Sequence, residues 1–382
     1  MASFRIGRIF GIPIEIDLTF LLVLPLLAWL IGSQVGFWVD LLGLFPDVTV
    51  PGGELTEGAT PWLLGLAAAV GLFACVLLHE LGHSAVALRY GFEIVSIKLW
   101  LLGGVAQFAE MPEDWRQELT VSVAGPLVSL AVGVLSYVAF AALPADLPAL
   151  RFVAGYLALM NVTLAVFNML PGFPMDGGRV LRALLARNRS HVRATQLAAT
   201  VGKAFAVLFG FLGLFTFDFL LVALAFFIYM GASGEARQTA LKAAFEGVTI
   251  RDVMIPTADL RSVSEETTVA DLLDRMLRER QVGYPVTRGD DFVGLVTLDD
   301  TRSVREVERD AYRVEDVMTR DVPTLHPDDP VMDAVTAMQT NGVGWLPVET
   351  DDGEFVGLLS QSDLVMALNI SRSGGTIGPI RM

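Results

Sequence analysis

The sequence has few of the residues that provide cross-links and positive charge. It contains one cysteine, Cys75, in 382 residues, and only three lysines among 27 basic residues. A single cysteine excludes a disulfide within the chain. No stretch offers the basic stripe that replaces counterions along a phosphate backbone, so we expect no nucleic-acid partner. Charged residues make up 18% of the chain and hydrophobic residues 53%, which is too apolar for an ordinary soluble protein.

The charges that are present are unevenly distributed. Residues 1–245 carry 14 basic and 16 acidic side chains, a net charge of −2, whereas residues 246–382 carry 13 and 26, a net charge of −13. The first part is apolar enough for a membrane, and the second is acidic enough to need water. An acidic, lysine-poor tail also suits a salt-rich cytoplasm, where repulsion between carboxylates is screened, so we expect a halophilic source.

Long apolar stretches predict about six transmembrane helices. Four stretches reach the roughly 20 residues that span the hydrocarbon core: 17–43, 62–88, 119–142 and 152–170. The stretch 197–229 is too long for one span and is interrupted by Asp218, so it predicts two short spans that turn near Phe217.

The basic residues predict the orientation of these spans. They are absent from the loop at residues 44–61 and gather between the second and third spans and between the fourth and fifth. Cytoplasmic loops retain positive charge, so the loop at 44–61 faces outward. We therefore expect a multi-pass protein of the cell membrane whose N- and C-termini are cytoplasmic.

Residues 94–109 are apolar but too short to cross the bilayer. Val95, Ile97 and Leu99 alternate with their neighbours as in a strand, and Gly103-Gly104 is expected to turn the chain. Strand backbone at membrane depth is tolerated where protein covers it or a wet cavity meets it. We expect a re-entrant β-hairpin beside a water-accessible site. The alternative is an interfacial loop that only packs.

The acidic tail contains two copies of a unit of about 60 residues. Val248–Met254 is echoed by Tyr312–Met318, and Val293–Thr297 by Val356–Ser360. Each copy predicts a helix, two strands and a helix, with buried strands beginning at Gly283 and Gly344. The expected fold is therefore a polytopic α-helical membrane protein with a re-entrant β-hairpin, followed by a cytoplasmic α/β domain.

The second predicted span contains the motif His79-Glu80-Leu81-Gly82-His83. Residues four apart share one helix face, so both imidazoles can reach one zinc ion while Glu80 takes a proton from water. Such polar residues are costly inside a membrane and usually mark function. The alternative is a polar cluster that forms hydrogen bonds between helices.

A catalytic zinc ion needs a third protein ligand. The segment Asn168–Gly178 offers Asp176, which follows two prolines that end the fourth span and precedes two glycines that free the backbone. Asp218 is the rival carboxylate, but it lies at the predicted outer turn. The other two histidines, His191 and His326, lie in cytoplasmic segments and are expected to be surface or packing residues.

With these motifs, residues 1–190 resemble the site-2 protease family of intramembrane zinc metalloproteases. The resemblance rests on the two segments above and on Ala124-Gly125-Pro126 in the third span. It implies the following roles: His79, His83 and Asp176 bind Zn²⁺, Glu80 is the general acid/base, and Asn168 holds the scissile carbonyl or its oxyanion. The alternative for Asn168 is a polar residue at a helix end.

The same resemblance implies the substrates. These are membrane-anchored proteins in the lipid bilayer, cut within or near a span after the segment unwinds and adds to the hairpin as a strand. The sequence lacks the inserted PDZ domain of some relatives.

The tail repeat resembles a tandem pair of CBS domains, a regulatory module that often binds ATP or AMP and often dimerises. Four residues match its short ribose and phosphate pattern: Thr297, Asp300, Ser360 and Asp363. We expect an adenine nucleotide and a homodimer through this module, although the acidic surface opposes phosphate binding. The expected domains are a transmembrane zinc protease domain at 1–240, CBS repeats at 246–308 and 309–370, and a flexible tail at 371–382.

Together these features predict an intramembrane zinc metalloprotease that its cytoplasmic CBS pair regulates. One alternative is a CBS-regulated transporter or channel, which would leave the zinc ligands unexplained and shows no inverted repeat. Another is an inactive homologue that binds membrane helices, which the complete set of expected catalytic residues disfavours.

Overall fold

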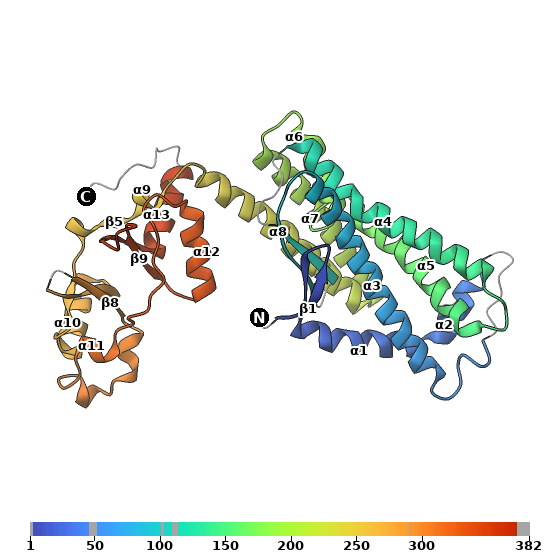
Figure 1. Cartoon of the computed structure of the whole chain (residues 1–382), viewed down its shortest axis with the longest axis horizontal. Coiled ribbons are helices and arrows are strands. Elements are labelled where there is room, and N and C mark those ends of the chain that lie inside the picture. Colours follow the sequence, from blue (N-terminus) through green and yellow to red (C-terminus); the bar gives the residue numbers. More distant parts are fainter. Residues whose placement is uncertain (1–2, 46–51, 101–102, 109–113, 290, 373–382) are drawn as a thin grey trace. The chain divides into compact units, whose positions relative to one another are not determined.

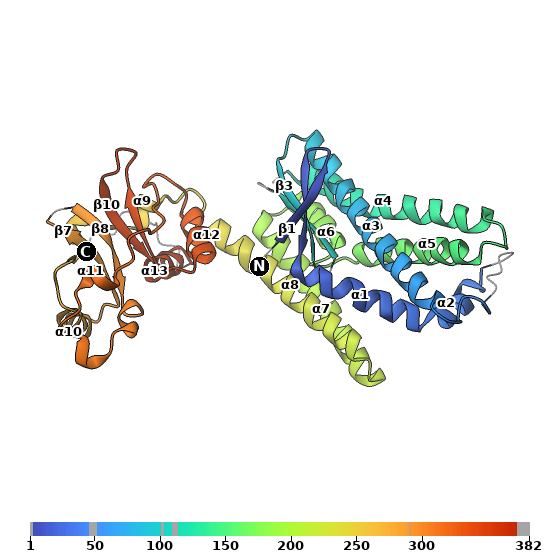
Figure 2. The same cartoon turned by 60° about the horizontal axis from the view of Figure 1, so that its bottom comes forward.

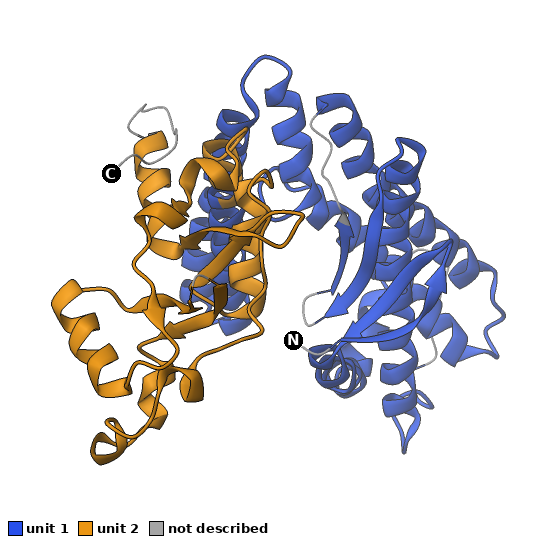
Figure 3. Cartoon of the chain, turned by 60° about the vertical axis from the view of Figure 1, so that its left-hand side comes forward, with its two compact units in different colours: residues 1–237 blue, residues 238–382 orange. Residues whose placement is uncertain are grey.

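The structure is a computed structural model of the chain. It describes all residues except 1–2, 46–51, 101–102, 109–113, 290 and 373–382, so part of the expected outer loop and most of the expected flexible tail lie outside it. The described chain divides into two compact units, Met1–Arg237 and Gln238–Met382 (Figure 3).

Long apolar helices form most of the first unit (Figures 1 and 2). Within the described residues, five helices are long and apolar enough to cross a membrane. They are α3 (Thr60–Arg89), α4 (Trp115–Ala142), α5 (Pro148–Asn168), α7 (His191–Thr216) and α8 (Phe219–Ala244). The pair α1 (Leu18–Ser33) and α2 (Val35–Leu42) makes a sixth candidate. The prediction of about six apolar spans is thus confirmed.

The first and last spans differ in detail from the prediction. The span expected at 17–43 is bent by 64°, because Gln34 has φ −117° and ψ 18° and interrupts the helix. The last two helices are each 26 residues long rather than short. They meet at Phe217, whose φ of 54° ends α7, and Asp218 then accepts the N–H groups of Leu220 and Leu221 at the start of α8.

Helix α3 packs against α1, α4 and α5. Small residues allow this close approach, since a Cβ at Gly65 would lie 2.1 Å from the carbonyl oxygen of Ala28 on α1. A Cβ at Gly82 would lie 2.8 Å from Val128 Cγ2 on α4. The helix that carries the predicted histidines is therefore held by close backbone contacts.

A four-stranded sheet in the order β1-β2-β3-β4 lies beside these helices. Its strands are β1 (Ser3–Ile9), β2 (Ile12–Asp17), β3 (Ile94–Trp100) and β4 (Gly103–Phe108). Strands β3 and β4 form the predicted antiparallel hairpin, and β2 pairs with β3 in parallel. The sequence pattern did not predict the hairpin of β1 and β2.

The prediction that Gly103-Gly104 forms the turn of this hairpin is wrong. Both glycines lie in β4, where they pair with Trp100 and Leu99 of β3. A Cβ at Gly104 would lie 2.6 Å from Glu80 Cγ, so glycine is needed there for β4 to approach α3. The connecting residues 101–102 lie outside the described part of the chain.

Within the described residues, the second unit contains two three-stranded sheets. The first consists of β6 (Val263–Ser264), β7 (Gly283–Arg288) and β8 (Asp291–Thr297), with helix α10 (Val269–Glu279). The second consists of β5 (Ile255–Pro256), β10 (Phe355–Ser360) and β9 (Trp345–Glu349), with α12 (Val331–Asn341) and α13 (Gln361–Arg372). The predicted buried strands are β7 and β9.

Short helices complete this unit. They are α9 (Ile250–Val253), α11 (Val314–Val317) and the 3₁₀ turns η1 (Thr257–Asp259), η2 (Asp300–Ser303) and η3 (Glu306–Glu308). After β8 the first copy continues into the short turns η2 and η3, where the repeat pattern predicts a full helix like α13.

The two copies are interlocked. Strand β5 belongs to the first copy but pairs with β10 of the second, while Thr319 of the second copy bridges to Leu295 in β8. Their cores follow the same exchange, because Ile250 packs in the cluster of the second copy and Val314 in that of the first. Each copy therefore completes the core of the other.

Candidate functional site

Two histidines of α3 and one aspartate of α6 (Asp176–Ala186) converge. The Nε2 atoms of His79 and His83 lie 3.1 and 3.2 Å from Asp176 Oδ2, and 3.2 Å from each other. Both histidines are 3% exposed. The structure thus brings together the three residues that the sequence predicted, as a group whose ligand atoms lie within 4.8 Å of one another.

Two groups of α4 orient the imidazoles. His79 Nδ1 lies 2.9 Å from Ser129 Oγ, and His83 Nδ1 lies 2.7 Å from the carbonyl oxygen of Val121. A carbonyl can only accept, so His83 Nδ1 donates, and Nε2 of the neutral ring keeps its lone pair. Such hydrogen bonds to the second ring nitrogen are typical of histidines that bind metal.

The third predicted motif contributes Gly125 of α4. A Cβ there would lie 2.2 Å from His83 Nε2 and 2.7 Å from His79 Nε2. The two imidazoles therefore occupy space that any side chain at Gly125 would fill. Two imidazole nitrogens and one carboxylate oxygen in such a setting fit zinc, which takes these donors in catalytic sites.

Asp176 is the first residue of α6, and two glycines fix its surroundings. A Cβ at Gly177 would lie 2.3 Å from the carbonyl oxygen of Leu170, and a Cβ at Gly178 would lie 2.4 Å from the backbone nitrogen of Phe173. These glycines lie inside the helix, so they serve close packing rather than the backbone freedom that we expected. The start of α6 is pressed against the segment that follows α5.

Glu80 directly follows His79 on α3, and Asn168 ends α5. The Glu80 carboxylate accepts the backbone N–H of Ala106 in β4 at 3.2 Å. Asn168 is the half-buried last residue of α5, two residues before the carbonyl of Leu170 that Gly177 approaches. Glu80 therefore lies on α3 itself, whereas Asn168 lies on a helix that packs against α3.

A buried charge cluster joins α4, α6 and α8 and is not apparent in the sequence. Arg182 of α6 pairs with Glu118 of α4 and Glu235 of α8, and both Arg182 and Glu118 are 3% exposed. The available signal was Glu118 directly before the third predicted span, while Arg182 counted only as a cytoplasmic loop charge. Among the described residues, Asp218, His191 and His326 do not join the group of three metal ligands.

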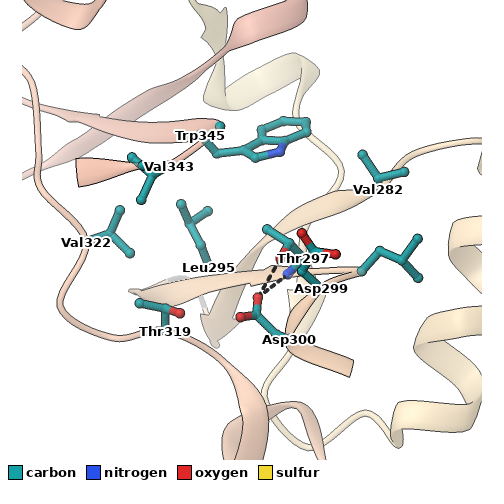
Figure 4. Close-up of a pocket in the computed structure, with 12 residues that line it drawn as sticks. Val282, Leu295, Thr297, Asp299, Asp300, Thr319, Val322, Val343 and Trp345 are labelled. Atoms are coloured by element: carbon teal, nitrogen blue, oxygen red, sulfur yellow. Dashed lines mark hydrogen bonds between the residues drawn. The ribbon is translucent and has the colours of Figure 1, made fainter. Parts of the chain in front are cut away.

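The second unit contains a cavity of about 510 Å³. Residues of both copies line it: Val282, Leu295, Thr297, Leu298, Asp299, Asp300, Thr319, Val322, Gly342, Val343, Gly344 and Trp345 (Figure 4). The Asp300 carboxylate accepts the backbone N–H of Thr297 at 2.6 Å and its hydroxyl at 2.7 Å. No lysine or arginine is among these twelve residues.

The second predicted nucleotide pair has the same local geometry but a different position. The Asp363 carboxylate accepts the backbone N–H of Ser360 at 2.8 Å and its hydroxyl at 2.6 Å. Ser360 and Asp363 are buried and are not among the residues that line the cavity. The structure therefore brings only Thr297 and Asp300 to this cavity.

Comparisons with known proteins agree on one family. Residues 67–151 and 144–209 match the model of peptidase family M50, and residues 250–305 and 314–370 match the CBS domain. The zinc metalloprotease MJ0392 of Methanocaldococcus jannaschii is 30% identical over 374 residues, which cover 96% of each chain.

Solved structures give partial matches. The site-2 protease from Methanocaldococcus jannaschii is 32% identical and covers 62% of this chain and 95% of its own, with a TM-score of 0.43. The structure of CBSX2 in complex with AMP is 25% identical and covers 33% of this chain and 99% of its own, with a TM-score of 0.29.

The match to the Methanocaldococcus metalloprotease includes both units, and the histidine and aspartate group agrees with it. The alternative of a CBS-regulated transporter or channel accounts neither for the match to a metalloprotease nor for the histidine and aspartate group. The chain therefore belongs to the site-2 protease family, peptidase family M50, and is a multi-pass intramembrane zinc metalloprotease with a C-terminal pair of CBS domains.

Proposed function

We propose that His79, His83 and Asp176 hold the catalytic zinc ion of this protease. The observation that carries the proposal is the convergence of two Nε2 atoms and one carboxylate oxygen within 3.2 Å. Three protein ligands leave a tetrahedral position open, as in catalytic rather than structural zinc sites. When bound, zinc supplies Lewis acidity to the peptide carbonyl and to the attacking water.

Glu80 is the proposed general acid/base. It follows His79 directly on α3, and its bond to the N–H of Ala106 holds its carboxylate beside β4. From this position Glu80 takes a proton from the attacking water and returns it to the leaving nitrogen. The half-buried Glu80 carboxylate therefore lies between α3, which carries it, and β4, the edge strand of the sheet.

The proposed substrate is a membrane-anchored protein whose cleaved segment is extended. Strand β4 is the last strand of its sheet, and an extended segment can add to such an edge by backbone hydrogen bonds. Asn168, at the end of α5, is proposed to hold the scissile carbonyl or its oxyanion. Cleavage would then occur within or near a transmembrane segment that has unwound.

Replacing Glu80 by glutamine tests this assignment. The variant should keep its zinc, because none of the three ligands changes, and should cleave a membrane-anchored reporter in detergent about 10²–10⁴-fold more slowly. Glu57→Gln, at an exposed carboxylate of the α2–α3 loop, is the matched control and should cleave normally. Wild-type cleavage by Glu80→Gln would contradict the role of Glu80. Asp176→Asn should instead lose zinc.

We infer from the charge distribution that both termini lie in the cytoplasm. The buried Cys75 is the single cysteine, so engineered cysteines report their own exposure. A membrane-impermeant maleimide should label Glu57→Cys on intact cells and Asp352→Cys only after permeabilisation, since both positions are exposed. The reverse pattern would invert the topology.

In the second unit we propose that the cavity binds an adenine nucleotide through Thr297 and Asp300. The volume of the cavity is within the range of small-molecule sites. The Asp300 carboxylate, which Thr297 holds in place, can accept hydrogen bonds from the hydroxyl groups of a ribose. Two carboxylates without a lysine or arginine disfavour a polyphosphate, so AMP should bind more tightly than ATP.

Calorimetry of the whole protein in detergent with AMP and with ATP tests this site. Asp300→Asn should weaken AMP binding at least about tenfold, and the exposed control Asp352→Asn should not. Absence of binding at millimolar AMP would remove the nucleotide proposal and would leave the protease assignment intact.

The expected homodimer has support in exposed apolar residues of the second unit. Leu277 of α10 is 80% exposed and Val307 of η3 is 88% exposed. A hydrogen bond from the N–H of Ala270 to the carbonyl of Arg309 joins their two segments. We propose that this surface pairs two chains. Light scattering should show a dimer that Leu277→Asp dissociates, and an unchanged mass for this variant would place the contact elsewhere.

A further inference from the structure

Arg182 lies at the centre of a buried charge cluster that joins three helices. Its Nε donates to Glu118 Oε1 at 2.6 Å and its Nη1 donates to Glu235 Oε1 at 2.6 Å. The guanidinium also lies over the ring of Phe173, 4.9 Å from the ring centroid. One side chain of α6 therefore contacts α4, α8 and the segment that precedes Asp176.

The geometry of this cluster is strongly constrained. Buried charges are tolerated when they are paired, and removal of one partner leaves the other uncompensated. The second oxygen of Glu118 is buried without a hydrogen-bond partner in the described part of the chain, and the first oxygen accepts the hydrogen bond from Arg182. Glu235 is less buried, with a side chain that is 27% exposed.

The cluster lies close to the proposed zinc ligand along a short, packed helix. Arg182 follows Asp176 by six residues, about 9 Å along the helix axis. Between them, Gly177 and Gly178 press α6 against the backbone of the preceding segment, which includes Phe173. A shift of α6 would therefore move Asp176 and Arg182 together.

The partner of Arg182 lies on the helix that orients the histidines. Glu118 belongs to α4, as do Ser129 and Val121, whose oxygens contact His79 and His83. The contact between Arg182 and Glu118 thus ties the helix of the aspartate ligand to the helix that holds the histidine ligands. Across these two links, the pair connects the helix of Asp176 with the groups that contact the two imidazoles.

Glu235 extends this connection to α8. That helix runs without interruption from Phe219 to Ala244 and passes the limit between the two units at Arg237 and Gln238. The contact with Glu235 therefore joins the aspartate-bearing helix to the helix that leads into the CBS domains.

We propose that Arg182 is a positioning residue that sets the distance between Asp176 and the two histidines, and that Glu235 couples this setting to α8. The proposal rests on the zinc assignment above. Arg182 donates to carboxylates of α4 and α8 and acts on the site through α6.

The test compares zinc affinity and ligand geometry in the whole protein. Arg182→Met should raise the zinc dissociation constant, measured by competition with a chelator, at least about tenfold. It should also change the visible absorption spectrum of the Co²⁺-substituted protein, which reports the ligand geometry. Arg182→Lys should lie between wild type and Arg182→Met, because an ammonium group pairs without the fork of the guanidinium. Arg189→Met, at an exposed arginine between α6 and α7, is the matched control.

The outcomes separate the two proposals. If wild-type protein binds no zinc, the zinc assignment is wrong and the positioning role is wrong with it. If wild type binds zinc and Arg182→Met has the same affinity and Co²⁺ spectrum, only the positioning role is wrong, even if its melting temperature falls.

Glu235→Gln provides a second variant in case Arg182→Met does not fold, since Glu235 is partly exposed. It should produce a smaller change of the Co²⁺ spectrum and of zinc affinity in the same direction. The double variant Arg182→Met/Glu235→Gln should be no worse than Arg182→Met alone, because Arg182→Met already removes the contact with Glu235. An unchanged spectrum in Glu235→Gln would overturn the coupling to α8.

Discussion

Replacing Gly125 by alanine should abolish tight zinc binding while it leaves the helices intact. The added methyl carbon would lie 2.2 Å from His83 Nε2, 2.6 Å from its Cε1 and 2.7 Å from His79 Nε2. Ordinary contacts begin at 3.4 Å, so the His83 ring or the backbone of α4 must move by about 1 Å. Alanine itself favours the helix, so the local backbone gains stability from the change.

This displacement is large on the scale of a metal site. Ligand distances must usually be correct to within about 0.2 Å. The shift of His83 would also strain its hydrogen bond to Val121, which lies on the same helix as Gly125. Loss of an outer partner alone costs about 10–100-fold in metal affinity, so a displaced ligand should cost at least about 100-fold.

The assay is zinc retained by purified protein in a series of chelator concentrations, with circular dichroism as the check on folding. Gly36→Ala is the matched control, because Gly36 also lies in a helix, α2, but no atom lies within 4 Å of an added Cβ. Gly36→Ala should bind zinc as wild type does. If Gly125→Ala also retains zinc with wild-type affinity, the argument that the imidazoles need the space beside Gly125 is refuted.

Three further predictions concern Ser129 beside the metal ligands, the ion pair of Arg288 with Glu265, and the net charge of residues 246–382. Ser129→Ala removes the hydroxyl partner of His79 Nδ1 and should weaken zinc binding about tenfold in the same chelator series; unchanged affinity would show that Ser129 does not orient the ring. The hydrogen bond from the Arg288 guanidinium holds the pKa of Glu265 below its ordinary value. The pair therefore stabilises the fold at pH values above the ordinary pKa, and this stability is lost as the pH falls through the lowered pKa. The melting temperature of the second unit should consequently decline less with acid in Arg288→Met than in wild type. The melting temperature of the second unit should also rise between about 0.1 M and about 1 M KCl. Over this range the Debye length shortens from about 10 to about 3 Å, so that repulsion among the carboxylates of residues 246–382, which carry a net charge of −13, is screened. A melting temperature independent of salt would contradict the halophilic interpretation.

The metal ligands could be predicted because their signal is local. His79 and His83 are one helical turn apart, so their shared face follows from the helix alone. Asp176 could be assigned because it is the one carboxylate in a segment with the right prolines and glycines on the predicted inner side. The rival, Asp218, caps α8 instead.

The buried charge cluster could not be predicted in the same way, because its signal is tertiary. Glu118, Arg182 and Glu235 lie on three helices and are separated by more than 50 residues along the chain. Each residue alone is compatible with a charged helix end at the membrane surface. Only the packing of α4, α6 and α8 shows that they meet.

The symmetry of the tail repeat also misled in part. Thr297-Asp300 and Ser360-Asp363 form the same hydrogen bonds, as their equal spacing suggests. Yet one pair lines the cavity and the other is buried. The second pair leads directly into α13, whereas the first leads into the 3₁₀ turn η2. Sequence similarity between copies therefore predicts the local turn and not its access to a ligand.

Because its two copies are interlocked, the second unit can complete its fold only after both copies have been synthesised. The core around Leu272 in the first copy includes Val314 and Met318, and β5 has its partner in β10 near the end of the chain. A ribosome that has released the first copy alone has therefore released an incomplete core. The membrane helices emerge first and can insert before β10, the last strand, has been synthesised. A chain truncated before Phe355 should therefore consist of an inserted protease domain and an unfolded tail that cellular proteases can degrade.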